Sequence, residues 1–158
     1  MRRKDRALER EAALRILDQT EWMTLSMTQP DGTPYAVPVN MTRAGEWLYF
    51  HCAREGKKID CLRACPQVCV TAVGHARVIP EQYTTEYESA VVFGTAEEVL
   101  EEAARWEGLR VFSQKFRPEP EEEFRAQNRG CFSQIALFRI RIQEIWGKGW
   151  RAPARPEP

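Results

Sequence analysis

Gly56, Lys57 and Lys58 form a basic turn whose residue types could bind an anion. The glycine can adopt backbone angles that other residues avoid, which lets the main chain approach a ligand closely. The two lysines open a predicted helix, Lys57–Ala64. Because the amides at a helix start point outward with partial positive charge, the turn could hold a phosphate, with Arg54 as a third cation. Taken alone, these residues also fit a solvated basic turn, which is the simpler interpretation.

A predicted strand, Trp47–Cys52, leads into this turn and would form one side of the site. Side chains alternate across a strand, so Leu48 and Phe50 are expected to face the core, and Tyr49 and His51 to face away from it. The outward face is aromatic with a polar tip. Such a face suits a surface that receives a ligand or a second subunit.

The cysteines and histidines could carry other chemistry, but their spacing argues against it. Cys61 and Cys65 would share a helix face, whereas Cys69 belongs to a predicted strand, and no Cys-x-x-Cys pair is present. His51 and Cys52 are consecutive on a strand and would point to opposite faces, so they cannot form a nucleophile and its base. We therefore predict no metal site and expect the cysteines to be small apolar residues.

The bulk composition narrows the class of protein and of partner. The 158 residues suggest one domain with a core of its own, and the charges balance at 23 basic against 23 acidic residues. Without a general basic field, no nucleic-acid partner is expected. The charged start, Met1–Arg6, is followed by no apolar run, so neither a signal peptide nor a membrane span is predicted. Five cysteines without secretion features indicate free thiols in the cytoplasm.

Short apolar runs separated by turn residues predict the elements that would position the basic turn. The expected strands are Trp22–Thr28, Tyr35–Thr42, Trp47–Cys52, Val68–Val73, Ser89–Ala96 and Ile135–Trp146, and the expected helices are Leu8–Asp18, Lys57–Ala64, Glu97–Phe116 and Glu121–Asn128. The first three strands should form a meander. The almost continuously apolar strand Val68–Val73 should be buried on both faces, and His75–Tyr87 should be irregular.

This pattern predicts an α+β fold that is mainly β, a six-stranded antiparallel barrel with peripheral helices, over residues 1–150 and followed by a disordered tail, 151–158. A barrel of about six strands fills its own interior with side chains and cannot enclose a large cofactor. A sizeable ligand would therefore lie outside the barrel, where a second subunit is the simplest cover. Binding and dimerisation would then be linked.

Several stretches, in order along the chain, resemble a known family. They are Met1–Arg6, Gly32–Asn40, Tyr49–Ala53, Glu55–Asp60, Pro66–Val70, Val78–Pro80, Tyr87–Gly94 and Gly147–Lys148. This set resembles the pyridoxamine 5′-phosphate oxidase-like superfamily of FMN-binding split barrels, and within it the nitroimidazole-resistance (Nim-like) group. Residues 106–133 match nothing in that group.

The resemblance implies a split β-barrel that forms a homodimer with FMN at each subunit interface. The implied cofactor contacts are the backbone of Val39 and Asn40, the strand residues His51, Cys52 and Ala53, the phosphate ligands Lys57 and Lys58, the partner-derived Glu88 and Ser89, and finally Trp146 and Lys148. His51 is also the implied catalytic residue, because its ring nitrogens could polarise a nitro or carbonyl group beside the flavin.

The function that the resemblance implies is FMN-dependent reduction of a small-molecule electron acceptor, either nitro-aromatic (nitroimidazole-like) or quinone-like. The chain carries no dinucleotide fingerprint for a reductant. Two alternatives stay open: a non-enzymatic flavin-binding module, and a haem-binding relative with His51 as axial ligand. Oxidation of pyridoxamine phosphate is not expected, because no arginine–histidine substrate clamp is recognisable near the C-terminus.

Overall fold

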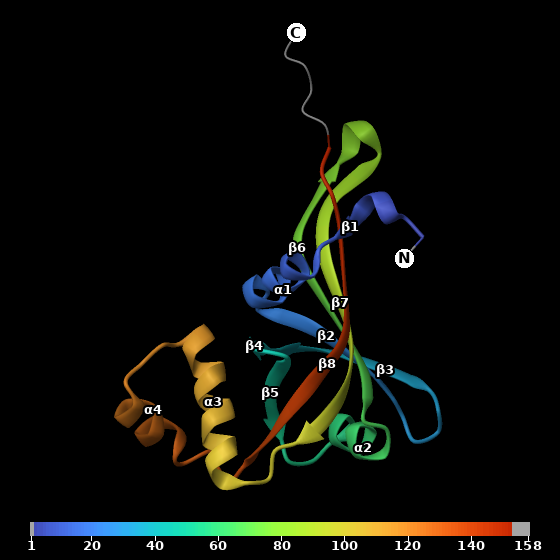
Figure 1. Cartoon of the computed structure of the whole chain (residues 1–158). Coiled ribbons are helices and arrows are strands. Elements are labelled where there is room, and N and C mark those ends of the chain that lie inside the picture. The colour runs from blue at the N-terminus through green and yellow to red at the C-terminus, as the bar shows by residue number, and fades with distance from the viewer. Residues whose placement is uncertain (1, 153–158) are drawn as a thin grey trace.

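The computed structural model describes residues 2–152, and over this range the chain forms eight strands in one antiparallel sheet (Figure 1). The strands are β1 (Ala7–Leu8), β2 (Trp22–Thr28), β3 (Pro34–Asn40), β4 (Thr42–Ala44), β5 (Trp47–Ala53), β6 (Gln67–Ile79), β7 (Thr84–Glu98) and β8 (Ile135–Trp150). The helices are α1 (Arg10–Gln19), α2 (Lys57–Ala64), α3 (Glu102–Phe116) and α4 (Glu121–Asn128), with 3₁₀ turns at Lys4–Arg6 and Pro80–Gln82.

The strand order is β3-β2-β6-β7-β8-β5-β4, with β1 added beside β8. β3 and β4 end this order, so the sheet formed by the described residues curves without closing, as a split barrel does. Six long strands, β2, β3, β5, β6, β7 and β8, make up most of it. The predicted α+β split barrel with peripheral helices is therefore confirmed.

The predicted meander is wrong at its third strand. β2 pairs with β3 on one side and with β6 on the other, whereas β5 pairs with β4 and β8. The chain therefore crosses at Met41 from one edge of the sheet to the other. An edge position suits β3, because Pro34 and Pro38 have no N–H to donate to a neighbouring strand.

The expected irregular segment is instead a long hairpin. β6 continues to Ile79 and β7 begins at Thr84, and the register resumes at Ala76 after a bulge. Pro80 begins the 3₁₀ turn between them, and Tyr83 completes it with a φ of 49°. Pro80 does not interrupt the hairpin, because it occupies the first position of a turn, where a missing N–H costs nothing. Figure 1 shows this hairpin, with the end of β8 beside it, extending away from the barrel.

β6 alternates rather than being buried on both faces. Val68, Val70 and Ala72 are buried, whereas Val73 is 54% exposed. On the same outward side of the sheet, Phe93 of β7 packs edge-on against Trp146 of β8, with ring centroids 5.4 Å apart. Val73, Phe93 and Trp146 thus form an uncovered apolar strip on this chain.

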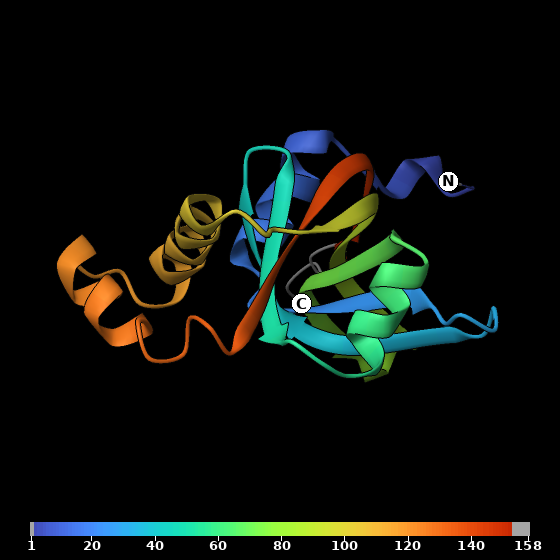
Figure 2. The same cartoon turned by 90° about the horizontal axis from the view of Figure 1, so that it is seen from below.

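The helices cover different parts of the sheet. α1 packs against β6, β7 and β8, where Gly147 allows the close approach of Ala13: a Cβ on this glycine would lie 3.0 Å from the alanine Cβ. α3 and α4 stand on one side of the sheet, and α2 and the β2–β3 hairpin on the other (Figure 2). α3 begins at Glu102 rather than at Glu97, because Glu101 caps it through hydrogen bonds from Ala103 N (2.9 Å) and Ala104 N (2.6 Å).

A second, smaller core lies between α3, α4 and the sheet and consists of Val99, Leu109, Phe124 and Leu137. The outward face of β5 therefore already has a cover from its own chain. Gly108 of α3 lies against Tyr49, and a Cβ at this glycine would come within 3.1 Å of the tyrosine ring and 2.5 Å of Leu137 Cδ2. This glycine therefore provides the close contact between α3 and β5.

Lys115 joins α3 to the barrel. Its ammonium group donates to the backbone oxygens of Thr20 (2.6 Å), Met41 (3.1 Å) and Leu17 (3.2 Å). Burial lowers the pKa of Lys115. The three backbone oxygens accept hydrogen bonds from all three N–H groups of its ammonium form.

We expect Lys115→Met to destabilise the protein by about 2 kcal/mol, because three backbone carbonyl groups would lose their donor. Chemical denaturation monitored by circular dichroism measures this change. The same substitution at the exposed Lys4 is the control and should leave the unfolding midpoint in place. Equal midpoints for the two variants would show that Lys115 does not hold α3 on the barrel.

The last described residues, Arg151 and Ala152, fall within the predicted tail but are held by hydrogen bonds. Arg151 donates to Glu88 (2.8 Å) and the amide of Ala152 to Glu86 (3.0 Å). Positions 153–158 lie outside the described residues. None of the described helices is both long and apolar enough to cross a membrane.

Candidate functional site

The start of α2 and the neighbouring end of β3 form a basic corner, which consists of Tyr35, Gly56, Lys57 and Lys58. Gly56 precedes the helix with a φ of 123°, a conformation that residues with a Cβ rarely adopt. Lys57 is exposed, and its ammonium lies 4.9 Å from the centroid of the Tyr35 ring. Lys58 is half-buried, with its ammonium 5.8 Å from the Phe50 ring centroid. The structure thus brings both predicted phosphate ligands to one helix start.

The amides at this helix start are available to a ligand. Among the described residues no side chain caps α2, and the first helical hydrogen bonds run from Ile59 and Asp60 back to Gly56 O. The amides of Lys57 and Lys58 precede those bonds, as the first amides of any helix do. With two ammonium groups beside them, they are suited to a doubly charged phosphate.

Arg54, the suggested third cation, is engaged elsewhere. Its guanidinium donates to Ser133 O (3.1 Å) in the loop before β8. It also lines a small hollow together with Glu98 and Ile135. The basic corner is therefore built from the two lysines and the helix start.

β5 ends near the basic corner, and its last three residues are His51, Cys52 and Ala53. Cys52 is half-buried, and burial raises the pKa of its thiol, although the charge of Lys58 opposes this shift. A thiol with a raised pKa stays protonated at neutral pH and is a poor nucleophile. Within residues 2–152, no group of three or more His, Cys, Asp or Glu side chains is arranged to hold a metal ion.

His51 points outward from β5 toward α3. Its ring meets that of Phe112 edge-on, with centroids 4.8 Å apart. Burial lowers the pKa of His51 below its ordinary value of 6.5, and the positive charge of Lys58 lowers it further. The imidazole is therefore neutral at pH 7, with one nitrogen able to donate and the other to accept a hydrogen bond.

A lowered pKa of His51 makes the folding stability depend on pH. Between the folded-state pKa and 6.5 the unfolded chain binds more protons than the folded chain, so stability is full above pH 6.5 and falls as the pH drops below it. We expect His51→Gln to remove this part of the dependence. Urea denaturation of the wild-type and His51→Gln proteins at several pH values between 5 and 8 measures this difference in the free energy of unfolding. The carboxylates titrate alike in the two proteins, so their contribution cancels in the comparison. Parallel stability curves would contradict the assignment.

Val39 and Asn40 lie at the far end of β3 from Tyr35. Asn40 is the fifth residue after Tyr35, which corresponds to roughly 17 Å of extended chain. Val39 is buried, and the Asn40 amide donates to Glu21 O (3.1 Å), so their side chains are occupied. Their backbone groups lie on an edge strand that begins at the basic corner.

The remaining predicted contacts form a second group on β7 and β8. Ser89 pairs in register with Lys148, and its hydroxyl donates to Lys148 O (3.5 Å). Trp146 and Lys148 share the outward side of β8 with Ser89, next to the apolar strip. Glu88 points to the opposite side of β7 from Ser89, and its carboxylate accepts from Arg151.

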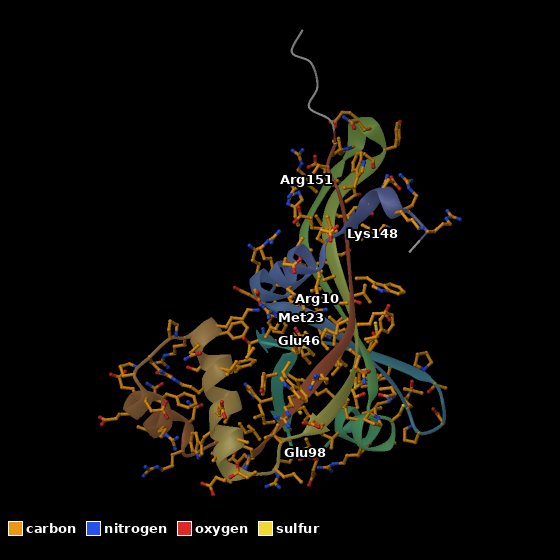
Figure 3. The ribbon with its side chains drawn as sticks, in the orientation of Figure 1. Arg10, Met23, Glu46, Glu98, Lys148 and Arg151 are labelled. Atoms are coloured by element: carbon orange, nitrogen blue, oxygen red, sulfur yellow. The ribbon has the colours of Figure 1, made fainter. Side chains whose placement is uncertain are left out.

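One chain does not bring His51 close to the β7–β8 group. His51 pairs with Leu137 of β8 and Ser89 pairs with Lys148 of β8. From position 137 to 148 the strand rises by eleven residues, or roughly 36 Å. Figure 3 shows this separation, with Lys148 near one end of β8 and Glu98 near the other.

The sequence interpretation missed a cavity beside His51. A space of about 300 Å³ lies between His51, α3 and α4, and Phe112, Phe116 and Glu119 are among the residues that line it. The signal available was the spacing of the two phenylalanines, four apart on a helix, which places them on one face.

Comparison with known proteins agrees with the split-barrel fold. A family model described as pyridoxamine 5′-phosphate oxidase matches residues 9–149. The chain belongs to this family. The predicted family is therefore confirmed, over nearly the whole chain. No curated protein sequence matches the chain.

Solved structures resemble this member of the family in fold. A conserved hypothetical protein from Mycobacterium tuberculosis superposes with a TM-score of 0.83 at 15% identity, covering 99% of this chain and 96% of that one. A candidate 5-nitroimidazole antibiotic resistance protein from Bacteroides thetaiotaomicron gives 0.74 at 19% identity, covering 90% and 85%. An FAD and haem binding protein from Mycobacterium smegmatis gives 0.74 at 24% identity, covering 92% and 75%.

Proposed function

We propose that this chain binds FMN with its phosphate in the basic corner, and that it reduces small nitro-aromatic or quinone-like electron acceptors. The observation that carries the proposal is the start of α2, where Gly56 at φ 123° precedes two lysines and no side chain from the described residues takes the cap position. An FMN phosphate carries nearly two negative charges and three acceptor oxygens, which two ammonium groups and outward amides can compensate.

The edge of β3 would support the rest of the cofactor. It runs from Tyr35 in the basic corner to Asn40, so a phosphate at one end and a flat ring toward the other would follow the same strand. A flavin supplies electron-transfer chemistry, while the protein orients it and tunes it. The neutral His51 would hydrogen-bond to a nitro or carbonyl oxygen, and the protonated Cys52 would stay inert.

The names of similar structures support a flavin and this class of acceptor. One of them is described as binding FAD and haem and another as a candidate nitroimidazole resistance protein. These likenesses are in fold at under 25% identity, so they support the proposal without identifying the cofactor.

We propose further that the protein acts as a homodimer whose sites each combine two chains. Support comes from the distance of roughly 36 Å along β8 between the levels of His51 and Ser89, which is too long for one cofactor to bridge. It also comes from the apolar strip, which lies on the same outward side as Ser89, Trp146 and Lys148. Burying this strip against a second copy would bring the β7–β8 group of one subunit toward the basic corner of its partner.

The visible absorption spectrum of the purified protein tests the cofactor. We expect the two bands of an oxidised flavin, and mass spectrometry of the released molecule should identify FMN. A haem Soret band would instead support the haem-binding alternative and would contradict this proposal.

Turnover tests the reaction. Under anaerobic conditions a nicotinamide donor should bleach the flavin bands, and a nitroimidazole or a quinone should restore them. Bound flavin that neither acceptor reoxidises would contradict the proposed reaction and favour a binding module.

A further inference from the structure

We propose that the cavity between α3, α4 and β5 is a second binding site, for a small aromatic molecule that carries a cationic N–H group. We call it the α3–α4 cavity. The lining residues that decide its chemistry are His51, Phe112, Phe116, Arg117, Glu119 and Phe124. Its volume of about 300 Å³ lies at the lower end of the range for ligand pockets, which sets the size of the occupant to one or two rings. Figure 2 shows the two helices standing beside the barrel at this place.

The walls of the cavity are aromatic. Phe112 and Phe116 lie one turn apart on α3 with ring centroids 4.8 Å from each other, and Phe112 also contacts the His51 ring. Phe124 of α4 adds a third ring that is fixed in the smaller core. Aromatic side chains in this number favour a flat apolar ligand and attract a positive charge to their faces.

A carboxylate in this aromatic surrounding sets the charge of the ligand. The Glu119 side chain is only 8% exposed, and its Oε2 has no hydrogen-bond partner among residues 2–152. A buried carboxylate oxygen without a donor costs free energy that a ligand N–H would recover. The unsatisfied group therefore favours a donor with a positive charge.

Arg117 forms an ion pair with Glu119 and would compete with a ligand for Oε2. Its Nε lies 3.5 Å from Oε2, outside hydrogen-bond geometry, and its side chain is 67% exposed. An exposed guanidinium is strongly screened by water and salt. A ligand cation would take its place against Glu119 and return Arg117 to solvent.

The backbone that carries Glu119 is held by α3. Arg110 donates to the backbone oxygen of Glu119 (2.6 Å) and pairs with Glu121 of α4 (3.3 Å). Its guanidinium also lies 5.4 Å from the Phe124 ring centroid. These contacts fix the segment between α3 and α4. The two helices, which each form one wall of the cavity, are therefore held at a fixed separation. The cavity shares His51 with the proposed flavin site, but its charge preference rests on Glu119 and not on a flavin in the basic corner.

Three probes of one shape test the charge preference: benzamidine, benzamide and benzoate. Isothermal titration calorimetry with the full chain should show benzamidine binding about tenfold or more tightly than benzamide, because a charge-assisted hydrogen bond exceeds a neutral one, and benzoate binding weakest. Benzamidine binding no more tightly than benzamide would overturn the proposal.

Two substitutions locate the site. Glu119→Gln should reduce the ratio between benzamidine and benzamide to within about threefold while benzamide still binds, since the amide keeps an acceptor but loses the charge. Arg117→Gln should tighten benzamidine binding severalfold, because it removes the competing cation. Glu123→Gln, an exposed change on α4, is the matched control and should preserve the wild-type ratio. A wild-type ratio in the Glu119→Gln variant, or no gain in the Arg117→Gln variant, would place the binding elsewhere.

Discussion

Combining Lys57→Ala with Lys58→Ala should reduce FMN affinity by about 10²–10⁴-fold. Each lysine is expected to contribute one charge-assisted hydrogen bond to the phosphate, at about 1.5–3 kcal/mol each, and about 1.4 kcal/mol corresponds to a tenfold change in affinity. Neither ammonium forms a hydrogen bond or ion pair with another described residue, and their recorded neighbours are the rings of Tyr35 and Phe50. The fold should therefore tolerate their removal. Fluorescence quenching of FMN titrated with apoprotein measures the affinity.

Riboflavin distinguishes the contribution of the phosphate to the affinity from that of the flavin ring. It lacks the phosphate, so wild-type protein and the double variant should bind it equally. Lys4→Ala, at an exposed lysine in the first 3₁₀ turn, should leave FMN affinity unchanged. If the double variant keeps FMN at wild-type affinity, the phosphate does not lie in the basic corner.

Gly94→Ala should cause the largest loss of stability among the substitutions considered. A Cβ at this buried glycine would lie 2.2 Å from the backbone oxygen of Arg141 and 2.9 Å from a methyl group of Ile140. The backbone cannot move aside cheaply, because β7 and β8 shift register between Phe93 and Gly94 and pair on both sides of the shift. Overpacking of this kind costs about 3 kcal/mol, which for a domain of this size is roughly 6–12 °C in melting temperature.

Differential scanning fluorimetry measures that shift, and Gly130→Ala is the matched control. Gly130 lies in the loop before β8, and a Cβ there would meet none of the described atoms within 4 Å. The control should melt within about 2 °C of wild type. A Gly94→Ala protein that melts with the control would mean that β7 and β8 are not bulged at this position.

Local patterns predicted most of the barrel because each strand buries one face. β2, α2 and α4 have the predicted bounds, and β8 alternates as expected, with Phe138 and Ile140 buried. The basic corner was also predictable, since its glycine and two lysines are consecutive in the sequence. Short-range chemistry of this kind depends little on tertiary contacts.

The features that were not predicted depend on contacts between distant segments. The crossing at Met41 follows from β6 taking the place beside β2, which no local pattern near residue 41 encodes. The cover over the outward face of β5 depends on Gly108 fitting against Tyr49, residues far apart in sequence. The α3–α4 cavity was missed for the same reason: its lining combines His51 of β5 with residues of α3 and α4, which lie far away in sequence.

Native mass spectrometry of the purified protein tests the central claim most directly, because it counts chains and cofactors together. The account predicts two chains carrying two FMN molecules, since each basic corner would be completed by the partner. A single chain that carries FMN, or a pair of chains that carries none after FMN is supplied in excess, would contradict it.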